Sequence, residues 1–223
     1  MAELRTEEEQ VEAIKRWWKE NGLSLVAGAA IAVAGVVGWN AWQGYQENQA
    51  TAASMRYQQL VNLTGGTEIA NPGEGRALAA EIVDEHGKTL YADLARLLDA
   101  RLAVAEGDLA GARASLEALI DQAQADYVAG LARLRLARLQ VADEDAEAAL
   151  ATLEGGVPEA LAAQRAAVRG DALHALGREA DAAAAWQEAL ALAEANDQPL
   201  YGVQLKLDNL GLATGTDNRG LDS

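Results

Sequence analysis

The sequence predicts an all-α protein: a single N-terminal transmembrane helix followed by a domain of stacked helical hairpins. Hydrophobic residues make up 50% of the 223 residues, yet aromatic residues are only 4% and Phe is absent. Ala and Leu, which favour helices, must therefore fill the core, and only three Pro interrupt the pattern. A charge-free stretch near the N-terminus and a repeated spacing further along supply the other two observations.

Residues 23–43 are expected to cross a lipid bilayer. The stretch from Leu23 to Trp42 carries no charged residue. Its length fits the ~20 residues that a helix needs to span ~30 Å of hydrocarbon. Aromatic residues bracket the stretch, as is typical of the two membrane interfaces. The expected interface residues are Trp17, Trp18, Trp39 and Trp42.

Basic residues predict the orientation of this helix. Lys15, Arg16 and Lys19 precede the span, and the first basic residue after it is Arg56. Because Lys and Arg are retained on the cytoplasmic side, residues 1–22 are expected to form a cytoplasmic tail. A cleaved signal peptide is the alternative. The apolar run is longer than is usual in a signal peptide and ends in bulky aromatics, which favours a retained anchor.

Turn-forming residues divide the rest of the chain into a connecting segment, a helical domain and a tail. Residues 44–75 are expected to form a connecting helix and a loop, the loop at 65–75 being dense in Gly, Asn and Pro. Residues 76–213 are expected to form the helical domain, with Pro199 opening its last helix. Residues 214–223 are expected to be a disordered tail.

A fixed spacing recurs three times in the helical domain. Gly107 is followed by Ala112 and Leu116, and the same offsets recur after Glu144 and after Gly177. The period of 37 and then 33 residues is close to the 34 of a tetratricopeptide repeat, so a tetratricopeptide-like helical repeat domain is predicted. In such repeats small residues lie where paired helices touch. The expected packing residues are Ala100, Ala112, Ala137, Ala149, Gly170, Ala182 and Trp186.

The same register predicts a binding groove on the concave face of the repeats. The position after each small contact residue, and the position three further on, are expected to face the groove. These candidates are Arg101, Val104, Arg138, Val141, Asp171 and His174. Arginine suits the recognition of carboxylates or backbone carbonyls, so extended polypeptide is the expected ligand. The alternative is that Arg101 and Arg138 pair with nearby acids such as Asp99 on a solvated face.

Charge and composition argue against several other functions. The net charge of −16 disfavours nucleic-acid binding. The acidity does not define a partner, since it is equally explained as an adaptation for solubility or salt. The chain has no Cys and only two His, far apart in sequence, and it lacks a phosphate-binding loop and a nucleophile elbow. No enzymatic activity, metal or cofactor is expected.

Five stretches together resemble one family, the YfgM-type ancillary subunits of the SecYEG translocon. They are EQVEAIKRWWKENG at 9–22, TLYADLARLLDARLAVAEGDLAGA at 89–112, LRLARLQ at 134–140, RGDALHALG at 169–177 and VQLKLDNL at 203–210. The resemblance implies a Gram-negative inner-membrane protein of single-pass type II topology with a periplasmic C-terminal domain. Its implied partners are SecYEG, a PpiD-type periplasmic chaperone and unfolded secretory polypeptides.

Two other functions remain open from the sequence. One is a tetratricopeptide scaffold for envelope assembly or cell division. The other is a membrane regulator that holds a cytoplasmic response regulator through residues 1–22.

Overall fold

The structure, a computed structural model, describes residues 7–65 and 71–210, and these contain helices and no strand. The all-α prediction is therefore confirmed. The helices run in chain order as follows: α1 (Glu7–Thr64), α2 (Pro72–His86), α3 (Leu90–Ala105), α4 (Leu109–Gln122), α5 (Asp126–Ala142), α6 (Ala146–Glu154), the short 3₁₀ helix η1 (Glu159–Leu161), α7 (Ala162–Ala175), α8 (Glu179–Ala195) and α9 (Val203–Asn209).

The chain forms two compact units, residues 1–51 and residues 52–223. In the first unit, α1 is the one helix among the described residues that is long and apolar enough to cross a membrane. The four predicted interface tryptophans are each at least half exposed, and the rings of Trp39 and Trp42 lie 5.2 Å apart. Because α1 is continuous, the expected boundaries after residues 22 and 43 coincide with no break in the helix.

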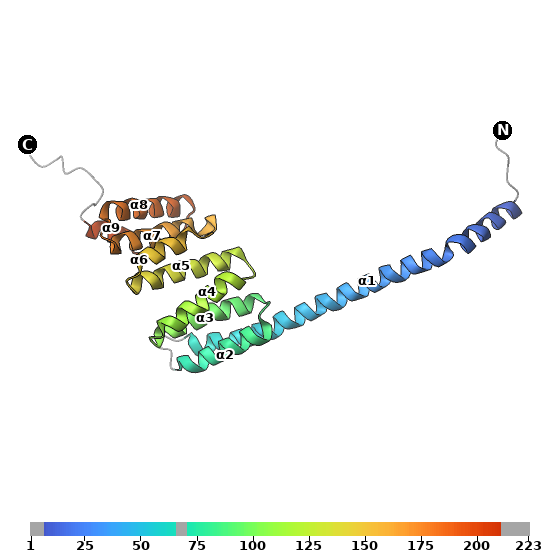
Figure 1. The fold of residues 1–223 in the computed structure, drawn as a ribbon, viewed down its shortest axis with the longest axis horizontal. Coiled ribbons are helices and arrows are strands. Elements are labelled where there is room, and N and C mark those ends of the chain that lie inside the picture. Colours follow the sequence, from blue (N-terminus) through green and yellow to red (C-terminus); the bar gives the residue numbers. More distant parts are fainter. Residues whose placement is uncertain (1–6, 66–70, 211–223) are drawn as a thin grey trace, which may run out of the picture. The chain divides into compact units, whose positions relative to one another are not determined.

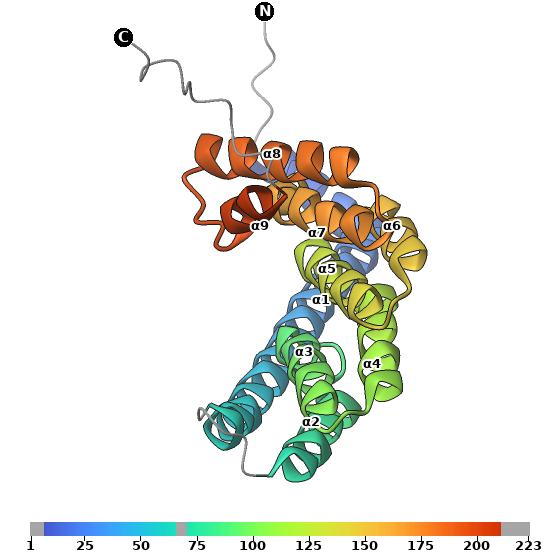
Figure 2. The ribbon, with the colours of Figure 1, turned by 90° about the vertical axis from the view of Figure 1, so that its left-hand side faces the viewer.

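The second unit is built of helices stacked in chain order (Figure 1). Figure 2 shows α3, α5 and α7 following one another in one layer, with α4 and α6 beside them in a second layer. Four apolar clusters fill the unit, each shared by successive helices: α1 to α3, α3 to α5, α5 to α7, and α7 to α9. Each hairpin therefore completes the core of the next, as expected of a repeat stack.

The repeated turns have one backbone geometry, which explains the period seen in the sequence. Gly107, Glu144 and Gly177 have positive φ angles of 78°, 62° and 72°. At each turn the next residue donates its backbone N–H to a carbonyl five residues before it, at 2.8–2.9 Å. This is the Schellman closure of a helix C-terminus. Asp108 and Asp145 then cap the following helices with their side chains.

Two predicted boundaries differ from the structure. Residues 72–75, expected to belong to a loop, are helical, because α2 begins at Pro72, a residue well suited to a first helical turn. The last helix starts at Val203 rather than at Pro199, since Gly202 has a φ of 80° that a helix cannot contain. Residues 214–223, expected to be disordered, lie outside the described part of the chain.

Candidate interaction surface

The predicted packing residues lie inside the second unit. Ala100, Ala112, Ala137, Ala149, Gly170, Ala182 and Trp186 are all buried. Trp186 is the largest fully buried side chain, and its Nε1 donates to the backbone oxygen of Ala167 at 3.2 Å and to Asp171 Oδ1 at 3.0 Å. These contacts join α7 to α8.

The predicted groove residues lie on three helices of one layer. Arg101 and Val104 belong to α3, Arg138 and Val141 to α5, and Asp171 and His174 to α7. Members of each pair are three residues apart and so share a helix face. Arg101, Arg138 and His174 are exposed, Val104 is 47% exposed, and Val141 and Asp171 are half-buried.

A third arginine joins Arg101 and Arg138. Arg135 is half-buried on α5, and its Nη1 donates to the backbone oxygen of Leu97 on α3 at 3.1 Å. Arg101 lies one turn beyond Leu97 on α3, and Arg138 lies three residues after Arg135 on α5. Burial, followed by the charges of Arg138 and Arg101, lowers the pKa of Arg135. We call Arg101, Arg135 and Arg138 the arginine cluster.

The arginine cluster has no acidic partner among the described residues. The alternative in which Arg101 or Arg138 pairs with Asp99 is wrong, because Asp99 pairs with Arg76 at 3.1 Å and accepts a hydrogen bond from Ser115. The cluster is therefore a concentration of uncompensated positive charge in a chain with 34 acidic and 18 basic residues.

Two tyrosines lie near the cluster. The rings of Tyr57 on α1 and Tyr91 on α3 are 5.8 Å apart, and both side chains are half-buried. Burial raises the pKa of Tyr57, and the charge of Arg135 opposes this rise. The charge of Arg135 thus reaches the Tyr57 hydroxyl, so the tyrosine pair lies in the same region of the unit as the arginine cluster.

Asp171 and His174 have partners at the other end of this layer. Asp171 Oδ1 pairs with Lys206 Nζ of α9 at 2.6 Å, besides accepting from Trp186. The His174 ring lies 5.6 Å from the Trp186 ring, and Lys206 Nζ lies 5.9 Å from the centroid of that ring. Asp171 is therefore engaged in holding α9 against α7 and α8. The structure does not bring it into contact with the arginine cluster.

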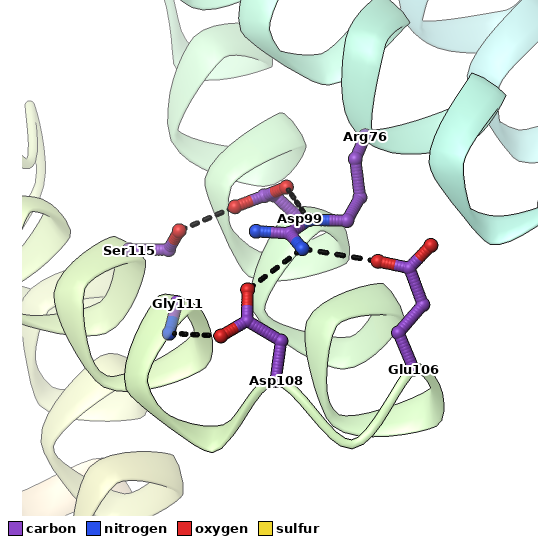
Figure 3. Close-up of polar contacts among 6 residues, drawn as sticks. All are labelled: Arg76, Asp99, Glu106, Asp108, Gly111 and Ser115. Carbon is purple, nitrogen blue, oxygen red and sulfur yellow. Dashed lines mark hydrogen bonds and ion pairs between the residues drawn. The ribbon is translucent and has the colours of Figure 1, made fainter.

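A different arginine is fully neutralised between α2 and α4. Figure 3 shows Arg76 of α2 directed at Asp99 of α3 and at Glu106 and Asp108 beyond its end. Its Nη1 pairs with Glu106 at 3.0 Å and with Asp108 at 2.8 Å. These hydrogen bonds raise the pKa of Arg76, that to Glu106 most strongly.

The Asp108 carboxylate has two roles in this network. Asp108 Oδ1 accepts from the backbone N–H of Gly111 at 2.9 Å, capping α4, while Oδ2 binds Arg76. The hydrogen bond from Gly111 and then that from Arg76 lower the pKa of Asp108. The network borders an open surface cavity of about 630 Å³. Arg76 is the shared cation of three carboxylates on α3 and in the α3–α4 turn, so the network joins α2 to that turn.

Another buried pair is also structural. Asp93 is completely buried on α3, with its Oδ1 3.5 Å from Arg96 Nη1. Asp93 Oδ2 accepts from the backbone N–H of Gln124, and Arg96 Nη2 donates to Gln122 Oε1. The pair thus fixes the α4–α5 connection to α3. Within the described part of the chain, no group of His, Asp and Glu is arranged to hold a metal ion.

Comparison with known proteins identifies similar sequences. A family model described as "Tetratricopeptide repeat-like domain" matches residues 15–212. The ancillary SecYEG translocon subunit of Haemophilus influenzae is 34% identical over 116 residues, or 52% of this chain and 55% of the relative. The protein of the same name from Escherichia coli (strain K12) is 34% identical over 111 residues, or 50% and 52%.

A third protein of that name, from Aggregatibacter actinomycetemcomitans, is 35% identical over 118 residues, which are 52% of this chain and 55% of the relative. The matches thus span about half the length of these curated relatives. They confirm the expected resemblance to ancillary translocon subunits. No solved structure matches the chain.

Proposed function

The chain belongs to the tetratricopeptide repeat-like family, and from this premise we propose that it is a membrane-anchored interaction protein of the Sec translocon. The observation that carries the proposal is its similarity to three curated relatives, each named as an ancillary subunit of SecYEG. The apolar stretch of α1 supplies an anchor beside a membrane-embedded channel. The helical repeat supplies an extended surface of the kind that binds other proteins.

The finer proposal concerns topology and chaperones. The N-terminus lies in the cytoplasm and the repeat domain in the periplasm, as the basic residues before the span favour. There the domain links SecYEG to a PpiD-type chaperone and assists the passage of unfolded secretory polypeptides. The exposed face that carries Arg101, Val104, Arg138 and Val141 is the proposed contact surface. The proposed function is non-enzymatic.

Co-purification of the full chain after mild detergent extraction tests the proposal. Recovery of SecY, SecE and SecG with a periplasmic chaperone is expected. Recovery of cell-division or outer-membrane assembly proteins instead would favour the scaffold function. Recovery of a soluble response regulator would favour regulation through residues 1–22. Either of these last two results, without Sec subunits, would contradict the proposal.

Crosslinking in cells tests the proposed contact surface separately. The double variant Arg101→Glu, Arg138→Glu reverses two exposed charges that have no ion-pair partner among the described residues. It should fold normally and lose crosslinks to the chaperone or to nascent chains. A control, Arg165→Glu, Arg178→Glu, makes the same change in net charge on α7 and at the N-cap of α8. Crosslinks that survive in both variants would exclude this face as the contact surface.

A further inference from the structure

The arginines of the second unit differ sharply in their pairing. Eleven arginines are described between residues 52 and 210, and six form ion pairs with acidic side chains. Five have no such pair among the described residues, and three of these five make up the arginine cluster. The other two, Arg133 and Arg165, lie apart from it on α5 and α7. Three of the five arginines without an ion pair among the described residues are therefore grouped in one region of an acidic chain.

The cluster is held together despite its own repulsion. Arg135 is fixed by its hydrogen bond to the Leu97 carbonyl and cannot swing away without losing it. Arg138 lies three residues after Arg135 on α5, and Arg101 lies one turn beyond Leu97 on α3. Like charges at such spacing oppose one another, and partial burial weakens the screening by water. The mutual repulsion of the three guanidinium groups opposes folding, and a bound anion would offset that repulsion.

The surroundings of the cluster indicate the kind of anion. Val104 and Val141 lie one turn beyond Arg101 and Arg138 on the same helix faces. Tyr57 and Tyr91 supply aromatic surface nearby. A ligand that covers this face must therefore carry both anionic and apolar groups along its length. An extended polypeptide does so, because alternate side chains project to the same side at roughly 7 Å intervals.

We propose that the arginine cluster is a binding site for an extended polypeptide segment rich in Asp or Glu, with Val104, Val141 and the Tyr57–Tyr91 pair contacting its apolar side chains. The planar guanidinium group binds carboxylates through paired hydrogen bonds, which gives Arg an advantage over Lys here. The net negative charge of the chain opposes binding of such a segment elsewhere on the surface, so its charge-dependent affinity should come from the cluster.

This inference rests on the proposed function only in taking the repeat domain to be a protein-binding module, and it does not require SecYEG. The test uses the purified full chain in nanodiscs of zwitterionic lipid and two fluorescent peptides. The first peptide alternates Glu with Leu and Ser, and the second has Gln in place of every Glu. Fluorescence anisotropy measures the Kd of each peptide. Sec co-purification, described above, is a separate readout, so the two ideas can fail independently.

We expect the Glu peptide to bind at least about tenfold more tightly than the Gln peptide. The variant Arg101→Gln, Arg138→Gln should abolish this preference. Arg165→Gln, Arg178→Gln removes the same net charge elsewhere and should leave the Kd within about twofold. Raising the salt from about 50 to about 200 mM should weaken binding of the Glu peptide, because screening shortens the range of the attraction.

Three results would overturn the proposal. One is equal affinity for the Glu and Gln peptides. Another is equal weakening in both double variants, which would reflect net charge alone. The third is no peptide binding but a higher melting temperature in nanodiscs that contain phosphatidylglycerol than in zwitterionic nanodiscs, lost in Arg101→Gln, Arg138→Gln, which would identify a lipid headgroup as the ligand. Circular dichroism of the variants verifies that they are folded, as expected for Arg101 and Arg138, which are exposed and have no ion pair among the described residues, and for Arg178, whose pair with Asp181 is exposed.

Discussion

The backbone of Gly170 on α7 lies directly against the indole ring of Trp186 on α8. A Cβ atom added at Gly170 would overlap the five-membered part of that ring. Trp186 is only 2% exposed, and its Nε1 donates to two acceptors on α7. The ring therefore occupies the place of a side chain on the facing helix. This contact sets how closely the third hairpin closes.

The first prediction follows from this contact. Trp186→Ala should lower the free energy of unfolding by about 3–5 kcal/mol, because a large cavity opens in the core. Gly170→Ala should lower it by about 1–3 kcal/mol through overpacking. The two changes should not be additive, since Gly170→Ala becomes harmless once the ring is gone. Chemical denaturation followed by circular dichroism measures all four states of the cycle.

Gly156→Ala provides the control for that experiment. No atom lies within 4 Å of a Cβ placed at Gly156. Its effect on stability should therefore be small. Additive changes at Gly170 and Trp186 would mean that the two residues are not in contact.

The repeat could be predicted from sequence because its turns and contacts depend on local chemistry. Glycine is favoured at the positive φ of the turns, as at Gly107 and Gly177, and small residues are favoured where the helices touch, so both recur at a regular spacing in the sequence. At the start of α2, by contrast, the sequence is misleading. Gly75 suggests a loop, yet it is a helical residue whose missing side chain leaves room for Leu102 and Thr64. Only tertiary packing distinguishes the two uses of glycine.

The candidate site was accessible to sequence reasoning only in part. Arg101 and Arg138 share a register position, so helical geometry places them on corresponding faces. Arg135 does not occupy that position, and its role depends on a carbonyl of another helix. Asp171 occupies the register position but is paired by Lys206, a residue outside the repeat. Partners that come from distant segments cannot be read from spacing.

The second prediction concerns Arg76. Arg76→Gln leaves three carboxylates near one another without their shared cation. The free energy of unfolding should fall by about 1–2 kcal/mol, a value between those typical of exposed and of buried ion pairs. Arg178→Gln, which breaks only an exposed pair between the N-cap residue of α8 and Asp181 three residues later, is the matched control. Similar stability of the two variants would show that the network around Arg76 contributes nothing beyond a surface ion pair.

The third prediction concerns pH. The pKa of Asp108 lies below its ordinary value of 3.8 in the folded protein. Its ionised form therefore stabilises the fold above that pH, and the contribution is lost as the pH falls through the lowered value. Asp108→Asn keeps an acceptor for Gly111 but removes the charge that attracts Arg76. Thermal melts should separate variant and parent at pH 7 and bring them together in strong acid. A constant difference at every pH would refute this explanation.

The fourth prediction concerns the membrane helix. Val33 lies near the middle of the charge-free stretch and is exposed on α1. Val33→Arg should impair insertion at a cost of about 2.5–3.5 kcal/mol on translocon-based scales, whereas Val33→Leu should not. A C-terminal alkaline phosphatase fusion, active only in the periplasm, reports orientation. Activity from the parent fusion and its loss in Val33→Arg are expected. If the parent chain is inactive with alkaline phosphatase at its C-terminus but active with a reporter that works only in the cytoplasm, the orientation is the reverse of the proposed one.

The fifth prediction concerns the effect of the arginine cluster on the stability of the fold. Arg101 and Arg138 have no ion pair among the described residues, and both repel Arg135, so removing their charges relieves strain. Arg101→Gln, Arg138→Gln should raise the melting temperature by roughly 1–2 °C, because about 0.5 kcal/mol corresponds to such a shift in a domain of this size. The gain should shrink as salt is added, since screening already weakens the repulsion. A structural role predicts the opposite, a loss of stability on substitution. A drop in melting temperature at low salt would therefore mean that the two arginines hold the fold together, which would contradict the proposed anion-binding role of the cluster.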